Sequence, residues 1–387
     1  MSKILIGVTS SISTKLLRGQ LEYFSKRGYD MHLICSPDGN IDFVPSSNIK
    51  VHKVRMKREI APFSDLLSLF QIIWVYLKVR PDITNVSTPK ASLLCMIAAY
   101  LTRTPMRIYS IIGLRFETCT GKKRKLLLTI EKLICKWSTA CIAVSPSLKE
   151  VLIQEGLAPK EKIKVLGSGS YNGLDLSEFE LDKPEVARLR KQYLGESDNQ
   201  VIGYVGRLTK DKGTDDLVEA FTELAREKSN LTLLLVGDFE DGDAVTTITK
   251  KRILEGQNIV KTGFVPKTAS YYRLMDVFIL PTYREGFGNV LLEAAAADIP
   301  VVTTNVTGAK DAIIPNETGL LIEAGNITEM KDAIKTLLEN KEEAARLSEK
   351  GQERVRREFQ SEVIWRNLDI VYNRTEAVEQ NVYEIEK

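Results

Sequence analysis

Two short stretches of the chain carry charged residues and glycines in patterns suited to binding a phosphate ester. In the first, VIGYVGRLTKDKGTDDLVEAF, an apolar strand-like run passes through Gly206 and Arg207 into a helical pattern that begins near Gly213. Arg207 and Lys212 lie on the loop between them, and such loops of open α/β sheets bind anions through free amides and the helix dipole. The pattern predicts a diphosphate site, although a solvated loop with ordinary surface cations has the same composition.

The second stretch is VFILPTYREGFGNVLLEAAAADIPVV, in which a buried strand runs into a glycine-rich loop and then an alanine-rich helix. Gly286 and Gly288 allow the backbone to approach a ligand, and a helix that opens at Asn289 offers amides to a phosphate. Glu285 lies in the loop, whereas Glu293 lies in an otherwise apolar window, where an unpartnered carboxylate is costly to bury. We expect Glu293 to bind ligand hydroxyls; the alternative is a buried acceptor for backbone amides.

Other kinds of site have little support. The chain has no GxxxxGK[ST] and no strand followed by GxGxxG, which excludes a P-loop nucleotidase and the usual dinucleotide fingerprint. His32 and His52 are its only histidines, and we expect His32 to be packed in a strand. Histidine-dependent triads and histidine-ligated metals therefore have almost no residues from which to be built. Asp241 and Asp243 form a DxD pair, but the run around them is acidic and polar throughout, so we expect no metal.

The elements that position these residues form two series. The chain has 387 residues, of which 43% are hydrophobic, and short β-branched runs alternate with helical patterns almost from end to end. This alternation predicts α/β domains with parallel sheets. The polar stretch LDLSEFELDKPEVARLRKQYLGESDNQ predicts a connection at 176–198 between domains 1–175 and 199–360. Residues 361–387 are predicted to form a last helix. A Gly/Ser/Asn loop, GSGSYNGLDLSEF, precedes the connection and is expected to lie near a cleft, or to act as a hinge without ligand contacts.

Charge divides the chain in the same place. The formal net charge is +3, but residues 1–175 hold 26 Lys and Arg against 13 Asp and Glu, and residues 176–387 hold 28 against 38. The basic half includes an amphipathic stretch, 115–136, that is suited to an anionic membrane surface, or else is an ordinary helix with a solvated basic face. The longest apolar run, Leu66 to Leu77, is shorter than the roughly 20 residues that span a bilayer. We therefore expect no membrane-spanning segment.

The compartment follows from the remaining composition. The N-terminus lacks the features of a signal peptide, and the five cysteines form an odd set without CxxC spacing, which argues against a disulfide framework or a zinc cluster. These features predict a reducing compartment. We expect a cytoplasmic protein that associates peripherally with the inner face of a bacterial cytoplasmic membrane.

Taken in order, several strings resemble the retaining glycosyltransferases of family 4: GRLTKDKG, LLLVGDFEDGD, TGFVP, DVFILPTYREGFGNVLLEA with its E-x7-E pair, and TNVTGAKDAIIPNETGLLI. In the first half, MRIYSIIGLRFE, KKRKLLLTIEKLICKW, CIAVSPSLKEVL and GSGSYNGLDLSEF are similar to the branch that builds bacterial capsule and O-antigen repeats. The resemblance implies a GT-B fold: two facing Rossmann-like domains, the donor held mainly by the second, and a last helix that crosses back to the first.

The resemblance also implies roles for individual residues. Arg207 and Lys212 would bind the donor diphosphate, Glu285 would contact the donor sugar, and Glu293 would contact the ribose hydroxyls. The backbone at Phe264 and Val265 would bracket the base. The remaining donor-side candidates are Gly206, Gly286, Phe287, Gly288, Asn289 and Val290, whose last two amides would cap the diphosphate. The acceptor and cleft candidates are Gly7, Ser10, Ser11, Gly113, Arg115, Asn172 and Gly173.

Two positions depart from the family pattern. Members often carry a Gly-Gly pair in the first loop, whereas this chain has Gly7 alone, followed by hydroxyl residues in GVTSSIST. Many members also have a His-Gly near the end of a middle strand of the first domain, where this chain has Ile112 and Gly113. We therefore expect no protein general base from that strand. Cations and helix dipoles would stabilise the departing diphosphate, which would itself accept the acceptor's proton.

The expected activity is transfer of a hexose or N-acetylhexosamine from a nucleotide diphosphate sugar, UDP-linked, to a polyprenyl-diphosphate-linked glycan. The expected reaction retains anomeric configuration, needs no metal or other cofactor, and involves no nucleic acid. A nucleotide-sugar epimerase or a sugar phosphorylase on the same scaffold is the alternative, although an epimerase would show more acid and base residues. A non-catalytic sugar- or nucleic-acid-binding protein would have no need of the intact E-x7-E pair and its Arg/Lys set.

Overall fold

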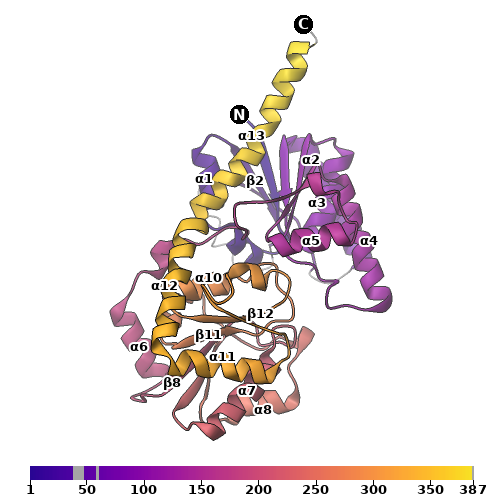
Figure 1. Ribbon diagram of the computed structural model, residues 1–387. Coiled ribbons are helices and arrows are strands. Elements are labelled where there is room, and N and C mark those ends of the chain that lie inside the picture. Colours follow the sequence, from indigo (N-terminus) through magenta and orange to yellow (C-terminus); the bar gives the residue numbers. More distant parts are fainter. Residues whose placement is uncertain (38–47, 58–60, 386–387) are drawn as a thin grey trace. The chain divides into compact units, whose positions relative to one another are not determined.

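The computed structural model describes residues 1–37, 48–57 and 61–385, with side chains described as far as residue 373. The chain folds into two compact units (Figure 1). The first contains residues 1–173 together with the C-terminal segment from Ser361, and the second contains Leu174–Gln360. Each is built on a parallel sheet with helices connecting its strands. The predicted fold class, two Rossmann-like domains with parallel sheets and a last helix returning to the first, is confirmed.

The first unit is built on a seven-stranded sheet in the order β3-β2-β1-β4-β5-β6-β7. All its strand pairs are parallel. The order reverses between β1 and β4, which makes their carboxyl ends the switch point at which such sheets bind ligands. The strands are β1 (Lys3–Gly7), β2 (Asp30–Cys35), β3 (Lys50–Lys53), β4 (Ile83–Val86), β5 (Met106–Ile111), β6 (Ala140–Ala143) and β7 (Ile163–Val165).

Helices cover both faces of this sheet, since right-handed crossovers place α1 on one face and α2, α3 and α4 on the other. Three of them, α2, α3 and α5, begin with a proline in the first turn, where its missing N–H costs nothing. The helices before the connection are η1 (Ile12–Leu17), α1 (Gln20–Lys26), α2 (Pro62–Val79), α3 (Pro89–Leu101), α4 (Gly121–Trp137), α5 (Pro146–Gln154) and the short η2 (Lys160–Lys162).

The last helix, α13 (Ser361–Ile385), completes the core of the first unit beside α1 (Figure 1). Ile364, Leu368 and Val371, whose spacing predicts a helix, are buried there against the sheet and α1. Tyr372 is also buried, and its hydroxyl accepts a hydrogen bond of 2.9 Å from the Asn85 amide in β4. Helix α13 therefore supplies part of the hydrophobic core of this unit.

The second unit has a six-stranded parallel sheet in the order β10-β9-β8-β11-β12-β13, with its switch point between β8 and β11. The three central strands β8, β9 and β11 read as near-continuous apolar runs because helices cover both faces. The strands of this sheet are β8 (Gln200–Val205), β9 (Leu231–Val236), β10 (Ile259–Gly263), β11 (Val277–Leu280), β12 (Val301–Thr304) and β13 (Leu320–Ile322). The helices are η3 (Leu176–Phe179), α6 (Lys183–Tyr193), α7 (Thr214–Glu227), η4 (Asp241–Asp243), α8 (Thr247–Glu255), α9 (Ala269–Tyr272), α10 (Asn289–Ala296), η5 (Ala309–Ala312), α11 (Ile327–Glu339) and α12 (Lys341–Glu358).

The polar stretch 176–198, expected to connect the domains, carries η3 and α6 and is part of the second unit. Asp182 caps α6 by accepting a hydrogen bond of 3.0 Å from the Glu185 amide, and Leu189 is buried on its inner face. A helix that buries so little apolar surface resembles a linker in composition, which explains why the sequence does not predict it.

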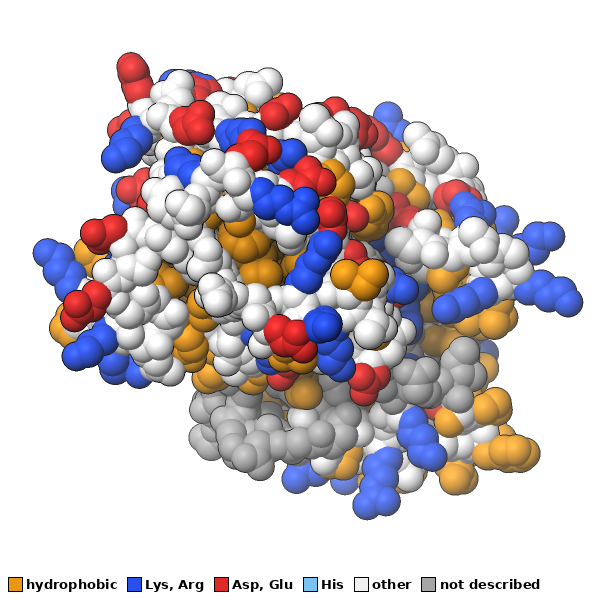
Figure 2. All heavy atoms as spheres, turned by 90° about the horizontal axis from the view of Figure 1, so that it is seen from below, with side chains coloured by type: hydrophobic (Ala, Val, Ile, Leu, Met, Phe, Trp, Pro, Cys, Tyr) orange, Lys and Arg blue, Asp and Glu red, His pale blue; other side chains and the backbone are white. Residues whose placement is uncertain are grey.

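The molecular surface carries charges of both signs. Figure 2 shows acidic and basic side chains interspersed over the displayed face, and hydrophobic side chains beside basic ones in the lower right part of the view.

Candidate functional site

The predicted donor-binding residues follow the carboxyl ends of the strands of the second sheet. Arg207 and Lys212 lie on the loop after β8, and Glu285 lies on the loop after β11. These two strands pair with one another at the point where the strand order reverses. The structure therefore brings the two sequence motifs together at the switch point of the sheet, where open α/β sheets bind ligands.

The loop after β8 is held by close backbone contacts. The buried Tyr204 hydroxyl donates a hydrogen bond of 2.7 Å to the Arg207 carbonyl. A Cβ at Gly237 would lie 1.8 Å from the Gly206 carbonyl oxygen, and one at Gly213 would lie 1.9 Å from that of Pro281. Only glycine fits at these crossings. Arg207 is thus displayed from a fixed backbone.

Lys212 and Glu285 contact one another, since the Lys212 ammonium donates to Glu285 Oε1. Lys212 also donates to the carbonyl of Arg284 at 3.4 Å. The family resemblance implies a diphosphate contact for Lys212 and a sugar contact for Glu285. The direct pair brings these two candidate residues together.

A second pair of charges lies beside it and was not predicted. Arg284 donates to Asp211 Oδ2 at 2.9 Å, while Arg207 donates to Glu240 at 2.6 Å and lies 3.6 Å from Asp211. Burial opposes ionisation of Asp211, but a hydrogen bond from Thr209 and the nearby cations outweigh it and hold the pKa of Asp211 below its usual value. Asp211 lies within GRLTKDKG, and Arg284 directly precedes Glu285. The opposite charges of these two residues were the sequence signal from which the ion pair could have been predicted.

The glycine-rich loop after β11 is shaped by its neighbour after β12. Gly308 has a φ of +80°, and a Cβ there would lie 2.3 Å from the Gly286 carbonyl oxygen. Gly288, also at positive φ, is the N-cap of α10, which begins at Asn289 and Val290. Phe287 is buried against Phe359, with ring centroids 5.3 Å apart. These contacts fix the first turn of α10, which carries a partial positive charge and begins at Asn289, shortly after Glu285 in the sequence.

Glu293 lies inside α10 and is partly buried, as its apolar window predicts. Its Oε2 accepts hydrogen bonds from the Tyr272 hydroxyl at 2.8 Å and from Thr268 at 3.2 Å, both at α9. Burial raises the pKa of Glu293, and these two hydrogen bonds oppose the rise. The alternative of an acceptor for backbone amides is not what the structure shows, since both donors are side chains. Sequence reasoning missed Tyr272 and Thr268.

The loop after β10 carries the residues assigned to the base. Phe264 is 71% exposed and Val265 is partly buried. The loop begins at Gly263, which has a φ of +77° and forms a bridge with Gly237. The loops after β8, β9 and β10 are therefore tied to one another at one edge of the sheet.

The acceptor-side candidates lie in the first unit. Gly7 ends β1 at the switch point, and a Cβ there would lie 2.9 Å from Cys95 Sγ. Ser10 and Ser11 follow on the same loop, where the Ser10 hydroxyl lies 2.9 Å from that of Ser13. Gly113 follows β5 with a φ of +145°, and Arg115 is exposed nearby.

Asn172 has structural partners within the first unit. Its amide oxygen accepts from Trp365 at 2.7 Å and from Gln20 at 3.2 Å, and its nitrogen donates to the Arg18 carbonyl at 2.8 Å. The adjacent Gly173, at a φ of +67°, donates to the Ser170 hydroxyl at 3.1 Å. Asn172 therefore joins α13 to the segment around α1.

Neither the histidines nor the acidic DxD pair forms a cluster of three or more potential metal ligands, and no such cluster occurs among the described residues. His32 is buried in β2 and pairs with His52 in β3, with ring nitrogens 2.9 Å apart. Asp243 accepts a hydrogen bond of 2.8 Å from the Asp211 amide. Its carboxylate thus shapes the loop that carries Arg207.

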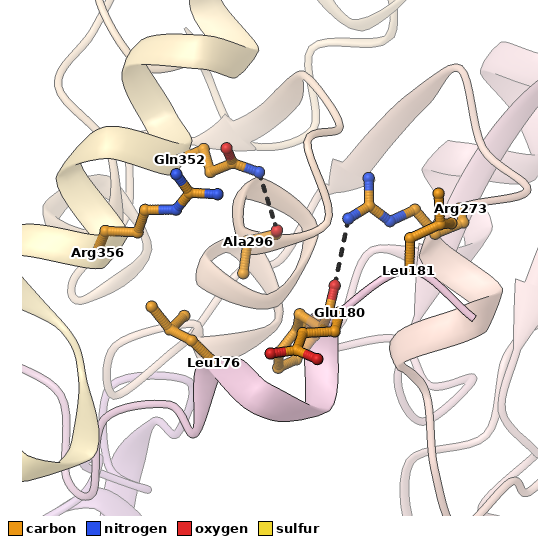
Figure 3. Close-up of a pocket in the computed structure, with 8 residues that line it drawn as sticks. Leu176, Glu180, Leu181, Arg273, Ala296, Gln352 and Arg356 are labelled. Atoms are coloured by element: carbon orange, nitrogen blue, oxygen red, sulfur yellow. Dashed lines mark hydrogen bonds between the residues drawn. The ribbon is translucent and has the colours of Figure 1, made fainter. Parts of the chain in front are cut away.

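A cavity of about 240 Å³ lies elsewhere in the second unit. Figure 3 shows the Arg273 and Arg356 side chains on either side of it, with Leu176 and Glu180 between them. Arg273 donates to the Phe179 carbonyl at 3.2 Å. The cavity reaches α10 at Ala296, its carboxyl end, whereas the loop that carries Glu285 meets the same helix at its amino end. The cavity is therefore separate from the predicted diphosphate site.

Comparison with known proteins gives matches in both halves of the chain. The family described as "Glycosyl transferases group 1" matches residues 185–354, and "Glycosyl transferase 4-like" matches residues 4–145. The chain is 40% identical over 371 residues, covering 96% of it and 97% of the other protein, to the capsular polysaccharide biosynthesis glycosyltransferase CapM of Staphylococcus aureus. It is 26% identical over 330 residues, 83% of each chain, to the UDP-Gal:alpha-D-GlcNAc-diphosphoundecaprenol alpha-1,3-galactosyltransferase of Escherichia coli.

Solved structures show the same fold. HepE of Anabaena, crystallised in complex with UDP and glucose, has a TM-score of 0.80 at 21% identity, covering 96% of this chain and 100% of that one. Sucrose-phosphate synthase of Thermosynechococcus elongatus has a TM-score of 0.80 at 20% identity, covering 98% and 100%.

Proposed function

Because the chain belongs to the group 1, or family 4, glycosyltransferases, we propose that it transfers a hexose or an N-acetylhexosamine from a UDP-sugar to a polyprenyl-diphosphate-linked glycan. We place this reaction in the synthesis of a bacterial capsule or a related surface polysaccharide. The relative from Staphylococcus aureus is named for capsular polysaccharide biosynthesis, and the one from Escherichia coli for a UDP-galactose donor and a diphosphoundecaprenol-linked acceptor. HepE was crystallised with UDP.

The observation that carries the proposal is the pairing of Lys212 with Glu285 at the switch point of the second sheet, beside Arg207. A diphosphate bound here would meet two cations and the first turn of α10. A carboxylate that already contacts one of those cations would face the sugar attached to the diphosphate. Charge-assisted hydrogen bonds of this kind are short and strong.

The proposed reaction retains the anomeric configuration. The bond between the anomeric carbon and the diphosphate oxygen breaks, and a bond from the acceptor hydroxyl oxygen to that carbon forms on the same face. The hydroxyl proton moves to the departing phosphate oxygen. Arg207 and Lys212 stabilise the negative charge that develops on the diphosphate, which is the effect expected of preorganised cations. The position after β5 holds Ile112 and Gly113, so no imidazole from that strand takes part.

We assign the remaining residues as follows. Glu293 binds the ribose hydroxyls, since Tyr272 and Thr268 orient its Oε2. The loop at Phe264 and Val265 holds the base. Residues 199–360 bind the donor and residues 1–175 bind the acceptor, through the loops that contain Gly7 and Gly113. The protein works in the cytoplasm at the inner face of the membrane.

The test is incubation of the protein with UDP-, GDP- and ADP-sugars, with and without a bacterial lipid extract, followed by measurement of released nucleoside diphosphate. We expect UDP release that depends on the lipid, and a product with the anomeric configuration of the donor by NMR. Arg207→Ala is expected to abolish most of the release. Turnover by this variant at the wild-type rate would overturn the assignment of the diphosphate site.

A further inference from the structure

Helix α2 of the first unit exposes a row of large apolar side chains. The row, called here the α2 stripe, is Phe63, Leu66, Leu67, Phe70, Trp74 and Leu77, each between 52% and 89% exposed. At 3.6 residues per turn these positions fall within an arc of roughly 100° and run the length of the helix. Soluble proteins seldom expose a continuous apolar surface of this kind unless it contacts a partner or a membrane.

The opposite face of α2 is fixed on the sheet. Ile72, Tyr76 and Val79 are buried, and the Tyr76 hydroxyl lies 2.6 Å from that of Thr84 in β4. By length and composition alone α2 is the one helix among the described residues that could cross a membrane. Because one face packs on β4 and its neighbours, the folded unit leaves only the stripe available to lipid. The geometry suits a helix that lies on a membrane, with its apolar side chains in the acyl region.

Charge indicates which surface covers the stripe. Helix α2 packs on α3, and α3 packs on α4, so the three helices form one layer. Their sequences contain two acidic residues, Asp65 and Glu131. Asp65 is paired with Lys90 at 2.7 Å, and Glu131 accepts a hydrogen bond of 2.7 Å from the Tyr109 hydroxyl. Lys90 therefore neutralises Asp65, and the Glu131 carboxyl group is directed towards Tyr109 in β5.

Basic residues accompany the stripe in the same layer. The Lys78 ammonium lies 5.1 Å from the centre of the Trp74 ring. The exposed cations of α4 are Lys122, Lys123, Lys125, Lys132 and Lys136. Apolar insertion combined with such cations is the pair of signals that holds a protein stably on anionic lipid. A protein partner would need acidic groups and an apolar groove that match this surface. An anionic bilayer supplies negatively charged head groups and an apolar interior without a groove of matching shape.

We propose that the α2 stripe inserts into the acyl region of an anionic lipid bilayer, while the lysines of α4 contact the head groups. The α2 stripe lies outside the basic stretch 115–136, on which the sequence alone places membrane contact, and the proposal adds it to the lysines of that stretch. It makes α2 the hydrophobic anchor and α4 the electrostatic one. The binding needs no donor or acceptor, so its failure would leave the proposed transferase activity untouched.

The experiment is flotation of the full-length protein with vesicles of phosphatidylcholine alone or of equal parts phosphatidylcholine and phosphatidylglycerol. We expect binding to the mixed vesicles and at least a tenfold loss of binding in Phe70→Ser/Trp74→Ser. The matched control is Ile248→Ser/Leu254→Ser, which removes two equally exposed apolar side chains from α8 in the second unit. Neutralising Lys122, Lys123 and Lys125 is expected to weaken binding to the mixed vesicles and to reduce its dependence on salt. Wild-type binding by the Phe70/Trp74 variant would overturn the proposal.

A second measurement does not depend on the variant folding well. Lipids brominated in the acyl chain quench tryptophan emission only at the depth of the bromine, and the chain has three tryptophans. We expect quenching in the wild-type protein that is absent in Trp74→Phe. Equal quenching in both proteins would place the acyl contact elsewhere and overturn the proposal. The proposal would also be overturned if the wild-type protein self-associated without lipid and the Phe70/Trp74 variant did not. The stripe would then join two copies of this chain.

Discussion

Lys212 donates a hydrogen bond to Glu285 at the switch point of the second sheet, and the two side chains are only 15% and 18% exposed. Each neutralises the other in a site shielded from water. Removing one member of such a pair leaves an uncompensated, mostly buried charge, which is more damaging than the loss of an exposed ion pair. A diphosphate that takes Lys212 as a ligand competes directly with Glu285 and leaves that carboxylate available to a sugar hydroxyl.

Lys212→Ala is therefore expected to lower kcat/KM for the UDP-sugar by about a hundredfold or more, the scale of losing one preorganised charge stabiliser. Lys210→Ala is the matched control, since Lys210 lies exposed on the same loop and is expected to have little effect. Equal losses in the two variants would mean that loop charge in general, and not the Lys212–Glu285 pair, supports turnover.

Tyr272→Phe tests the proposed binding of the donor by Glu293, and whether that binding needs the ionised carboxylate. Burial raises the pKa of Glu293, and the Tyr272 hydroxyl opposes that rise by donating to Oε2. Removing the hydroxyl raises the pKa further, so the carboxylate becomes protonated at a higher pH. We expect KM for the donor in the variant to increase more at pH 6 than at pH 8, with kcat less affected. A change that is the same at both pH values would contradict this role.

The sequence predicts where the loops that carry Arg207, Lys212 and Glu285 lie, because each motif follows a strongly apolar strand and parallel strands bring their carboxyl ends to one edge. It does not predict the side chains that serve these motifs from a distance, such as Tyr272 and Thr268 at α9. The sequence pattern also does not indicate the short strands β3, β7 and β13 or the polar helices α6 and α12. These elements bury few side chains, so tertiary packing decides them and periodicity carries little signal. Asn172 shows the same limit, because its hydrogen bond to Trp365 spans 193 positions.

Gly308→Ala tests whether the shape of the loop that carries Glu285 matters apart from its charges. A Cβ at Gly308 would lie 2.3 Å from the Gly286 carbonyl oxygen and 2.7 Å from that of Glu285, so the loop must shift. We expect turnover of the UDP-sugar to fall strongly while denaturant unfolding shows that the variant remains folded. Gly195→Ala is the control, since Gly195 has a φ of +64° and nothing within 4 Å of its Cβ position. The free energy of unfolding of that variant is expected to fall by roughly 1 kcal/mol, the cost of a side chain at positive φ, with turnover unchanged.

Asn172→Ala is expected to destabilise the first unit by about 1–3 kcal/mol, because its removal leaves Trp365 and Gln20 without a polar partner. Chemical denaturation measures this change. Asn367→Ala is the control, since that amide donates to the Val363 carbonyl within the same helix, at 2.8 Å. An Asn172 variant with wild-type stability and a raised KM for acceptor would instead support the ligand-binding role predicted from the sequence.

Glu131 makes the stability of the first unit depend on pH. Burial raises the pKa of this carboxyl group to about 7, against the opposing hydrogen bond from Tyr109. The folded protein thus holds the proton more tightly than the unfolded chain, so stability is greatest below the unfolded pKa and falls as pH rises through 7. Glu131→Gln removes that loss and keeps an acceptor for Tyr109.

We expect Glu131→Gln to exceed the wild type by about 2 kcal/mol at pH 8, after allowance for partial exposure, and to match it near pH 4.5. Glu150→Gln, at an exposed position of α5, is the control and is expected to match the wild type at both pH values. Denaturant unfolding at each pH measures the difference. A stabilisation that grew as pH fell would contradict the assignment, because a carboxyl group with a raised pKa costs stability only above the pKa that it has in the unfolded chain.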